Sequence, residues 1–317
     1  MSPLISFVIP CFNLPEALVR ACLDSILSLS LRPGEREIIV VDDGSEPTPE
    51  PLLEPYRRDI IFVRKANGGA GDARNEGLRR CRGRYVQFVD GDDALIADGY
   101  ERILSLLRNH RPDVLMFRGT DHPEAVPEPR PFTPMTGTAY MSRHNMRAAV
   151  WGYIFERSLA DRLWFDVTLK YGEDEYFTDR LVLRSRRLID TAVPAYHYRP
   201  RPTSAIHDKS MAGMKKRLDD GMRVMTLLAA HYASSDEECR TALARRVAQL
   251  GMDHLYNVMR FTKGRRDTED AASRLRKEGM FPLPVKRYTF KYAVFALLSR
   301  YRAGRDLLRF AATCFNS

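Results

Sequence analysis

Cysteine is scarce in this sequence and irregularly spaced, which argues against two kinds of stabilising site. The five cysteines are odd in number and widely scattered: Cys11, Cys22, Cys81, Cys239 and Cys314. A disulfide framework needs pairs, and a structural zinc site needs closely spaced ligands such as CxxC. Neither site is predicted, and a reducing cytoplasmic location is expected.

Long apolar runs are missing too. No stretch reaches the ~18 uninterrupted apolar residues of a membrane-spanning helix. The first ten residues lack the basic region and long apolar core of a signal peptide. The sequence therefore predicts a folded cytoplasmic protein. If a membrane is involved, the protein is expected to lie on it, as a peripheral protein at the inner face of the cell membrane.

Acidic residues are the minority among charged residues. The chain of 317 residues has 50 Lys+Arg against 41 Asp+Glu, a formal net charge of +9. Such an excess favours anionic partners, namely nucleic acid, anionic lipid or phosphorylated substrates. Because the sequence has no recognised nucleic-acid-binding motif, nucleic acid is not expected as a partner.

Short β-branched or aromatic runs alternate with helical segments between residues 4 and 117. The predicted strands are residues 5–10, 37–41, 60–64, 85–89 and 114–117, and the helices include residues 14–30 and 99–109. Continuous apolar strands that alternate with helices are typical of a mostly parallel sheet covered on both faces. We therefore predict an α/β fold.

The chain is expected to divide near residue 208. A first half, residues 1–118, is separated from a second, residues 119–208, by a proline-rich stretch. Beyond it, residues 209–317 have apolar residues at helical spacing. We predict a main domain, residues 1–208, followed by a helical C-terminal region.

Polar residues follow several of the predicted strands, where ligands of open α/β sheets bind. These residues are Asn13, Asp42, Asp43, Asn67, Asp90, Asp92 and Asp93. The Asp-Gly-Ser segment after the second strand is also an ordinary turn former. At residues 90–93, however, three carboxylates stand within four residues and repel one another unless a cation offsets them. Mg²⁺, which takes one or two carboxylates plus substrate phosphates, suits such a cluster.

The segment Gly69–Arg74 mimics a dinucleotide-binding fingerprint without completing it. Arg74 stands where the third small residue is required, and the segment follows the third strand, not the first. A nicotinamide cofactor is therefore not predicted.

Four segments in order resemble the family 2 glycosyltransferases with the GT-A fold. They are SFVIPCFN (6–13), VVDDGS (40–45), NGG leading to ARNEGL (67–78) and FVDGDD (88–93). The resemblance covers roughly residues 4–207. It implies a GT-A domain and an inverting enzyme that transfers a sugar from a nucleoside-diphosphate donor, expected to be a UDP-sugar. The expected acceptor is a glycan or lipid-linked hydroxyl of a surface polysaccharide.

The resemblance also implies roles for individual residues. The nucleotide-binding residues would be Pro10, Asp42, Asn67, Arg74 and Asp90, with Asp42 at the base and Asp90 at the ribose. Asp92 would hold Mn²⁺ or Mg²⁺ against the diphosphate. Asp93 is either a second metal contact or a turn residue.

A second acidic segment, Glu173-Asp174-Glu175, opens a predicted helix that runs to about residue 185. Acidic residues are common in a first helical turn because they complement the helix dipole. Sugar transfer also needs a carboxylate that takes the proton of the attacking hydroxyl. By similarity to the family, Asp174 is the expected base and Glu173 the second candidate.

The segment 196–207 also looks like the family. There Arg199 and Arg201 would bind the diphosphate, because a guanidinium holds phosphate oxygens in pairs. His207 is a further candidate metal ligand, and a plain surface loop is the alternative for the whole segment. Among aromatic residues, Trp151 is the candidate for stacking on a sugar.

Residues 284–317 mix aromatic and aliphatic residues with seven Lys or Arg and a single acid, Asp306. This composition is typical of an interfacial helix on an anionic membrane, and equally of a helix that packs on its own domain. Two alternatives to a glycosyltransferase are a sugar-nucleotide nucleotidyltransferase and a non-catalytic membrane-associated scaffold. The first usually carries a glycine-rich basic loop where this chain has residues 11–15 (CFNLP).

Overall fold

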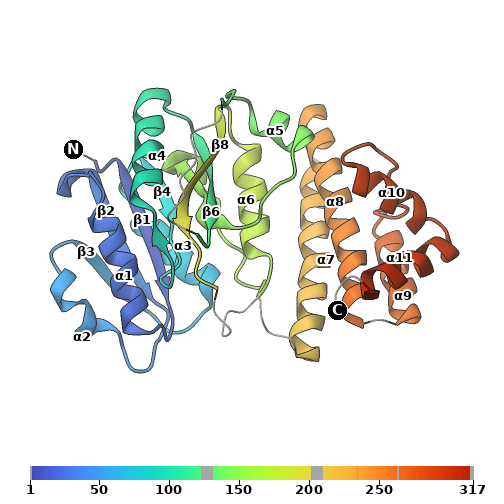
Figure 1. The fold of residues 1–317 in the computed structure, drawn as a ribbon, viewed down its shortest axis with the longest axis horizontal. Coiled ribbons are helices and arrows are strands. Elements are labelled where there is room, and N and C mark those ends of the chain that lie inside the picture. Colours follow the sequence, from blue (N-terminus) through green and yellow to red (C-terminus); the bar gives the residue numbers. More distant parts are fainter. Residues whose placement is uncertain (1, 123–130, 201–209, 234, 263, 315–317) are drawn as a thin grey trace. The chain divides into compact units, whose positions relative to one another are not determined.

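A computed structural model describes residues 2–122, 131–200, 210–233, 235–262 and 264–314. They form two compact units, which are described separately (Figure 1). The first unit comprises residues 1–137, 148–168 and 173–204. The second comprises residues 138–147, 169–172 and 205–317, so two short segments before residue 208 group with the C-terminal helices.

The first unit is built on a mixed sheet, which confirms the predicted α/β class. Within the described residues the strand order is β3-β2-β1-β4-β7-β6-β8-β5. The strands are β1 (Ile5–Cys11), β2 (Arg36–Asp42), β3 (Ile60–Arg64), β4 (Tyr85–Phe88), β5 (Ala94–Leu95), β6 (Val114–Thr120), β7 (Tyr153–Glu156) and β8 (Leu188–His197). β1 to β4 pair in parallel, whereas β7 runs antiparallel to both β4 and β6.

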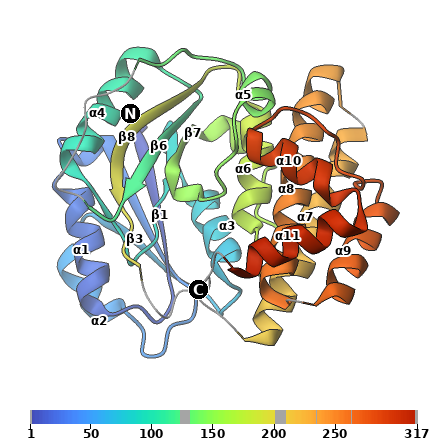
Figure 2. The same cartoon turned by 45° about the vertical axis from the view of Figure 1, so that its right-hand side comes forward.

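Helices cover this sheet on both faces (Figures 1 and 2). They are α1 (Glu16–Leu27), α2 (Glu50–Leu53), α3 (Ala70–Arg80), α4 (Ala97–His110) and α6 (Glu173–Leu183). All five predicted strands are present, and the strand at residues 60–64 has the predicted bounds.

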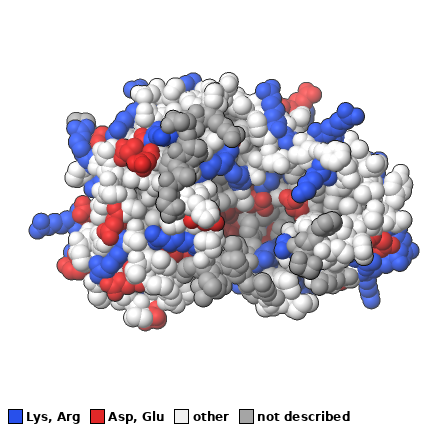
Figure 3. All heavy atoms as spheres, viewed as in Figure 1, with Lys and Arg blue, Asp and Glu red and all other residues white. Residues whose placement is uncertain are grey.

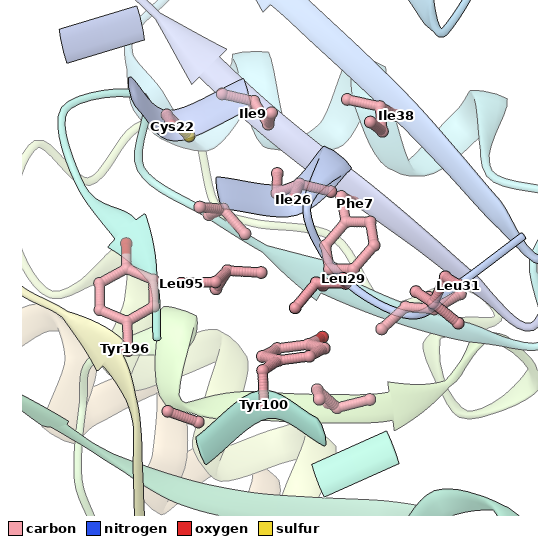
Figure 4. Close-up of a cluster of buried hydrophobic side chains, with 14 of the residues drawn as sticks. Phe7, Ile9, Cys22, Ile26, Leu29, Leu31, Ile38, Leu95, Tyr100 and Tyr196 are labelled. Carbon is pink, nitrogen blue, oxygen red and sulfur yellow. The ribbon is translucent and has the colours of Figure 1, made fainter. Parts of the chain in front are cut away.

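The side chains of β1 alternate between two hydrophobic layers, as expected for a central strand. Phe7 and Ile9 join a buried cluster with Ile26 of α1 and Tyr100 of α4 (Figure 4). On the other face, α3 packs closely on β1, because Gly77 lies directly against Val8. A sheet anchored on both faces holds the carboxyl ends of its strands in fixed positions.

The second unit is helical, as the sequence predicts for the C-terminal region. Its helices are α7 (Met211–Ala233), α8 (Glu237–Thr262), α9 (Arg265–Lys277), α10 (Phe290–Ser299) and α11 (Arg302–Cys314), and α5 (Gly137–Arg143) lies almost wholly within it. Asn145 Oδ1 accepts hydrogen bonds from Arg245 and Gln249 of α8, which ties the α5 segment to this unit. In the described part of the chain, no helix combines the length and apolarity needed to cross a bilayer.

Candidate active site

The carboxyl ends of β1 and β2 bring together the turns that follow them. Asp43 N donates to Cys11 O at 2.9 Å, and Asn13 N donates to Ser45 Oγ at 2.9 Å. The Asp43 carboxylate accepts hydrogen bonds from Gly68 N at 2.9 Å and Gly69 N at 2.7 Å, so it fixes the glycine-rich turn before α3. Asp43 therefore has a structural role.

Asp42, next to it, has a different environment. Its side chain is fully buried, and Oδ1 accepts a hydrogen bond from Ser45 N at 2.9 Å. Oδ2 lies 3.4 Å from Arg64 Nε in an ion pair but accepts no hydrogen bond. A buried carboxylate oxygen without a hydrogen bond is costly, so Oδ2 is an acceptor suited to an N–H group of a ligand. Nearby, Asn67 Nδ2 donates to Asp43 O at 3.0 Å.

Arg74 of α3 gathers three carboxylates at the same edge of the sheet. Its Nη2 donates to Asp90 Oδ1 at 3.0 Å, just beyond β4. Its Nη1 donates to Asp174 Oδ1 at 2.6 Å and to Glu173 Oε1 at 3.2 Å, both in the first turn of α6. The guanidinium also lies 5.5 Å from the centre of the Phe165 ring. Four predicted site residues thus form one cluster within the first unit.

This cluster carries more negative than positive charge, because one guanidinium faces three carboxylates. Burial raises the pKa of Asp174 to about 8; Arg74 opposes this rise, and Glu173 and Asp90 add to it. Burial lowers the pKa of Arg74. The three neighbouring carboxylates raise it by more, so its pKa lies above the ordinary value. Asp174 is therefore a carboxyl group that can exchange a proton near neutral pH.

The turn at residues 90–93 packs tightly against the end of β1. A Cβ added to Gly91 would lie 2.8 Å from Cys11 Sγ and 3.2 Å from the Pro10 carbonyl oxygen, so only glycine fits without displacement. Asp93 is buried and accepts a hydrogen bond from Arg199 N at 2.8 Å. Arg199 Nη1 also donates to Asp92 O at 3.4 Å. The segment that follows β8 thus contacts this acidic turn.

The described residues contain no cluster of three or more His, Cys, Asp or Glu side chains that could hold a metal ion alone. The side chain of Asp90 is bound to Arg74, and that of Asp93 is buried, whereas Asp92 is half-buried. This donor set does not fit a closed structural metal site. It fits Mg²⁺ or Mn²⁺ held by one carboxylate and completed by substrate phosphates. Arg201 and His207 lie outside the described residues.

Two aromatic residues, neither of them predicted to do so, support the acidic turn. Tyr196 of β8 accepts a hydrogen bond from Asp90 N at 3.0 Å. Trp151 stacks on the Tyr196 ring, with 4.4 Å between ring centres and an angle of 10° between the planes. This face of Trp151 is therefore not available to a sugar. Tyr196 lies in an apolar strand, and no local pattern distinguishes it from a core residue.

Comparison with known proteins finds similarity between this chain and sugar-transferring enzymes. The model of the family described as "Glycosyl transferase family 2" matches residues 6–166. The uncharacterized glycosyltransferase EpsJ of Bacillus subtilis is 29% identical over 248 residues, which cover 73% of this chain and 71% of that protein. The poly(ribitol-phosphate) beta-N-acetylglucosaminyltransferase TarS of Staphylococcus aureus is 24% identical over 245 residues, which cover 74% of this chain and 41% of that protein.

Solved structures share the fold. Residues 1–349 of S. aureus TarS, in complex with UDP-GlcNAc, superpose with a TM-score of 0.74 at 21% identity, covering 96% of this chain and 89% of that one. The mannosyltransferase PcManGT from Pyrobaculum calidifontis, in complex with GDP-Man and Mn²⁺, gives a TM-score of 0.54 at 15% identity, covering 98% and 88%. Both structures support the GT-A fold predicted from the sequence.

Proposed function

The chain belongs to glycosyl transferase family 2, and from this premise we propose that it transfers a sugar from a UDP-sugar to a hydroxyl of a glycan or lipid-linked acceptor. The product would be a precursor of a surface polysaccharide. The enzyme would work in the cytoplasm, at the inner face of the cell membrane. The observation that carries this proposal is the contact of Arg74 with Asp90, Glu173 and Asp174 at the carboxyl end of the sheet.

Asp174 is the proposed general base. The oxygen of the acceptor hydroxyl attacks the anomeric carbon, the bond from that carbon to the diphosphate oxygen breaks, and the hydroxyl proton passes to the Asp174 carboxylate. One direct displacement of this kind inverts the anomeric carbon. A base is most effective when its pKa lies near the working pH, which fits the pKa of about 8 at Asp174. Glu173 is the second candidate for this role.

The donor nucleotide would lie along the ends of β1, β2 and β4. The Oδ2 atom of Asp42 would accept a base N–H, since this buried oxygen makes no hydrogen bond within the protein. The backbone of Pro10 and the side chain of Asn67 would line the base pocket. Asp90 would bind the ribose, and Arg199 and Arg201 the diphosphate.

Asp92 is the residue proposed to hold Mn²⁺ or Mg²⁺, with His207 as a further candidate ligand. When bound, such an ion acts as a Lewis acid that offsets the charge developing on the leaving diphosphate. The contribution of this chain is to present one half-buried carboxylate at the end of β4, on a turn fixed by Gly91.

A thermal-shift screen of nucleoside-diphosphate sugars tests the proposal. A bound donor stabilises the folded state by mass action, by about 2.7 kcal/mol at a hundred times its Kd. We expect a UDP-sugar to raise the melting temperature, and to raise it further with Mn²⁺. If no nucleoside-diphosphate sugar raises it, the proposed function is wrong.

Hydrolysis of the donor that this screen identifies then tests the metal assignment. Asp92→Ala should abolish metal-dependent hydrolysis, whereas Asp59→Ala, at an exposed position just before β3, should leave it unchanged. Unchanged hydrolysis in Asp92→Ala would refute the assignment of the metal to Asp92.

A further inference from the structure

Large exposed hydrophobic side chains are concentrated near the end of the helical unit. Of twelve such residues in the described chain, seven lie between residues 285 and 310. They are Val285, Phe290, Val294, Leu297, Tyr301, Leu307 and Phe310, and Phe290 is 87% exposed. Scattered exposed hydrophobic residues need no explanation, but a concentration of this kind is typical of an interaction surface.

These residues recur at helical spacing on the outer faces of α10 and α11. Along α10 and the residue pair that follows it, Phe290, Val294, Leu297 and Tyr301 are exposed at intervals of four, three and four residues. Along α11, Ala303, Leu307, Phe310 and Cys314 repeat the same intervals. A helix of a water-soluble domain normally turns such an apolar stripe toward the core. Here both stripes face outward.

The opposite faces of both helices are firmly attached to the helical unit, so the outward stripes do not result from loose docking. Tyr292 is buried, and its hydroxyl donates to Pro284 O at 3.0 Å. Arg305 is buried and binds Glu269 of α9 through two hydrogen bonds of 2.8 and 2.6 Å. Both helices also contact α8, in front of which they lie in Figure 2.

Positive charge accompanies the stripes and is only partly neutralised. The one acid in residues 284–317, Asp306, is paired with Arg265 and Arg309. Five cations of this segment have no ion pair within the described residues: Lys286, Arg287, Lys291, Arg300 and Arg302. In the view of Figure 3, where the helices of this unit lie at the right, Lys and Arg side chains stand at the margin of a largely uncharged surface.

From this combination we infer that the outer face of α10 and α11 docks on an anionic lipid bilayer. Its apolar stripes would enter the interface between headgroups and acyl chains, and its unpaired cations would meet the headgroups. A second copy of this chain is a poorer occupant, because a symmetric contact would bring the same cations of two molecules together. This inference goes beyond sugar transfer and relies on the proposed function only for the idea of a lipid-linked acceptor.

Vesicle co-sedimentation of the full chain tests this docking surface. We expect binding to vesicles of phosphatidylcholine with added phosphatidylglycerol, weaker binding to phosphatidylcholine alone, and a decrease with rising salt. Arg287→Glu/Lys291→Glu should weaken binding by about thirtyfold or more, because each cation near an anionic surface contributes about fivefold. Phe290→Ser/Leu297→Ser should weaken it on both kinds of vesicle.

Matched substitutions on the same unit separate this face from general surface effects. Arg266→Glu removes an exposed cation of α9, and Met211→Ser removes an exposed apolar side chain of α7. Both should bind vesicles as the unchanged chain does, and circular dichroism should show all variants folded. Equal binding by the face variants and these controls would overturn the inference, as would self-association in sedimentation velocity that only the face variants abolish.

Donor hydrolysis, measured without vesicles, should not change in any of these variants. A failure of this inference therefore remains distinct from a failure of the proposed reaction.

Discussion

Arg74 Nη1 lies 2.6 Å from Asp174 Oδ1, and this contact joins α3 to the first turn of α6, one hundred residues later. The same guanidinium holds Asp90 at the end of β4. A carboxyl group that is proposed to accept a proton is therefore fixed in position by the protein before substrate binds. Such preorganisation is what a general base needs, because the acceptor hydroxyl must lie within hydrogen-bond reach of it.

Replacing Asp174 by Asn tests its role as base. We expect Asp174→Asn to lower the rate of sugar transfer by about 10²- to 10⁴-fold, the usual contribution of a general base. Donor affinity, measured by calorimetry, should change little, because the donor contacts proposed above lie elsewhere. Glu173→Gln is the matched control and should lower the rate of sugar transfer much less. A transfer rate within a few-fold of the unchanged enzyme in Asp174→Asn would mean that another group takes the proton.

The raised pKa of Asp174 predicts how activity depends on pH. Only the ionised carboxylate accepts a proton, and burial raises its pKa from 3.8 to about 8. We therefore expect kcat/KM to rise with pH and to level off above about pH 8. A profile that is flat between pH 5 and pH 9 would contradict this assignment.

The same shift predicts how stability depends on pH. The folded protein keeps a proton on Asp174 that the unfolded chain releases above about pH 4. The stability that this proton contributes is fully present below about pH 4 and is lost as pH rises toward 8. In Asp174→Asn this loss is absent. Between pH 5 and pH 8 the melting temperature of the variant, relative to that of the unchanged protein, should therefore rise with pH. If the two melting temperatures change in parallel with pH, the prediction is wrong.

Removing Arg74 should destabilise the first unit. Arg74→Met leaves three neighbouring carboxylates without their shared cation, and breaking a buried ion pair from one side costs about 3–5 kcal/mol. Urea denaturation measures this loss. Above the pKa of about 8 at Asp174, adding Asp174→Asn should recover part of it, because one fewer carboxylate is then left unpaired.

Arg79→Met is the matched control for this prediction. Arg79 lies on the same helix, but its side chain is 52% exposed and pairs with Glu76 at the surface. Exposed ion pairs of this kind contribute about 1 kcal/mol or less to the free energy of unfolding. Equal losses for Arg74→Met and Arg79→Met would show that the buried cluster contributes little to stability.

Local sequence patterns were sufficient to predict the first part of the fold. Continuous apolar runs predicted β1 to β4, and the rule for strand ends placed Asp42 and Asp90 at the same edge of the sheet. The antiparallel strand β7 was not predicted individually. It pairs with β4 through Tyr85 and Glu156, which are far apart in sequence, and a run of four residues has no period that reveals its direction.

The roles of individual site residues were harder to predict, because they depend on contacts between distant parts of the chain. The resemblance placed Arg74 near the nucleotide but gave no sign that its guanidinium binds carboxylates 16, 99 and 100 residues away. Tyr196 supports the acidic turn through a contact with Asp90, 106 residues earlier. Spacing along the sequence gives no indication of either contact.

The close approach of α3 to β1 gives a final prediction, at a residue one helical turn beyond Arg74. A Cβ added to Gly77 would lie 2.2 Å from Val8 Cγ1 in the buried layer between helix and strand. At an exposed helical site, Gly→Ala usually stabilises by about 1 kcal/mol. At Gly77 we expect a loss of about 1–3 kcal/mol, because overpacking must displace α3 or Val8. The displacement would also carry Arg74 away from its carboxylates, so sugar transfer should fall as well.

Two companion variants separate this steric cause from a general effect of losing glycine. Gly34→Ala adds a Cβ that meets no atom within 4 Å, so the free energy of unfolding should change by about 0.5 kcal/mol or less. Gly77→Ala combined with Val8→Ala should be less destabilised than the sum of the two single variants, since the smaller side chain at residue 8 makes room for the added methyl group. Strictly additive losses would show that the contact between Gly77 and Val8 does not set the distance between α3 and β1. In that case the position of Arg74 would not depend on that contact.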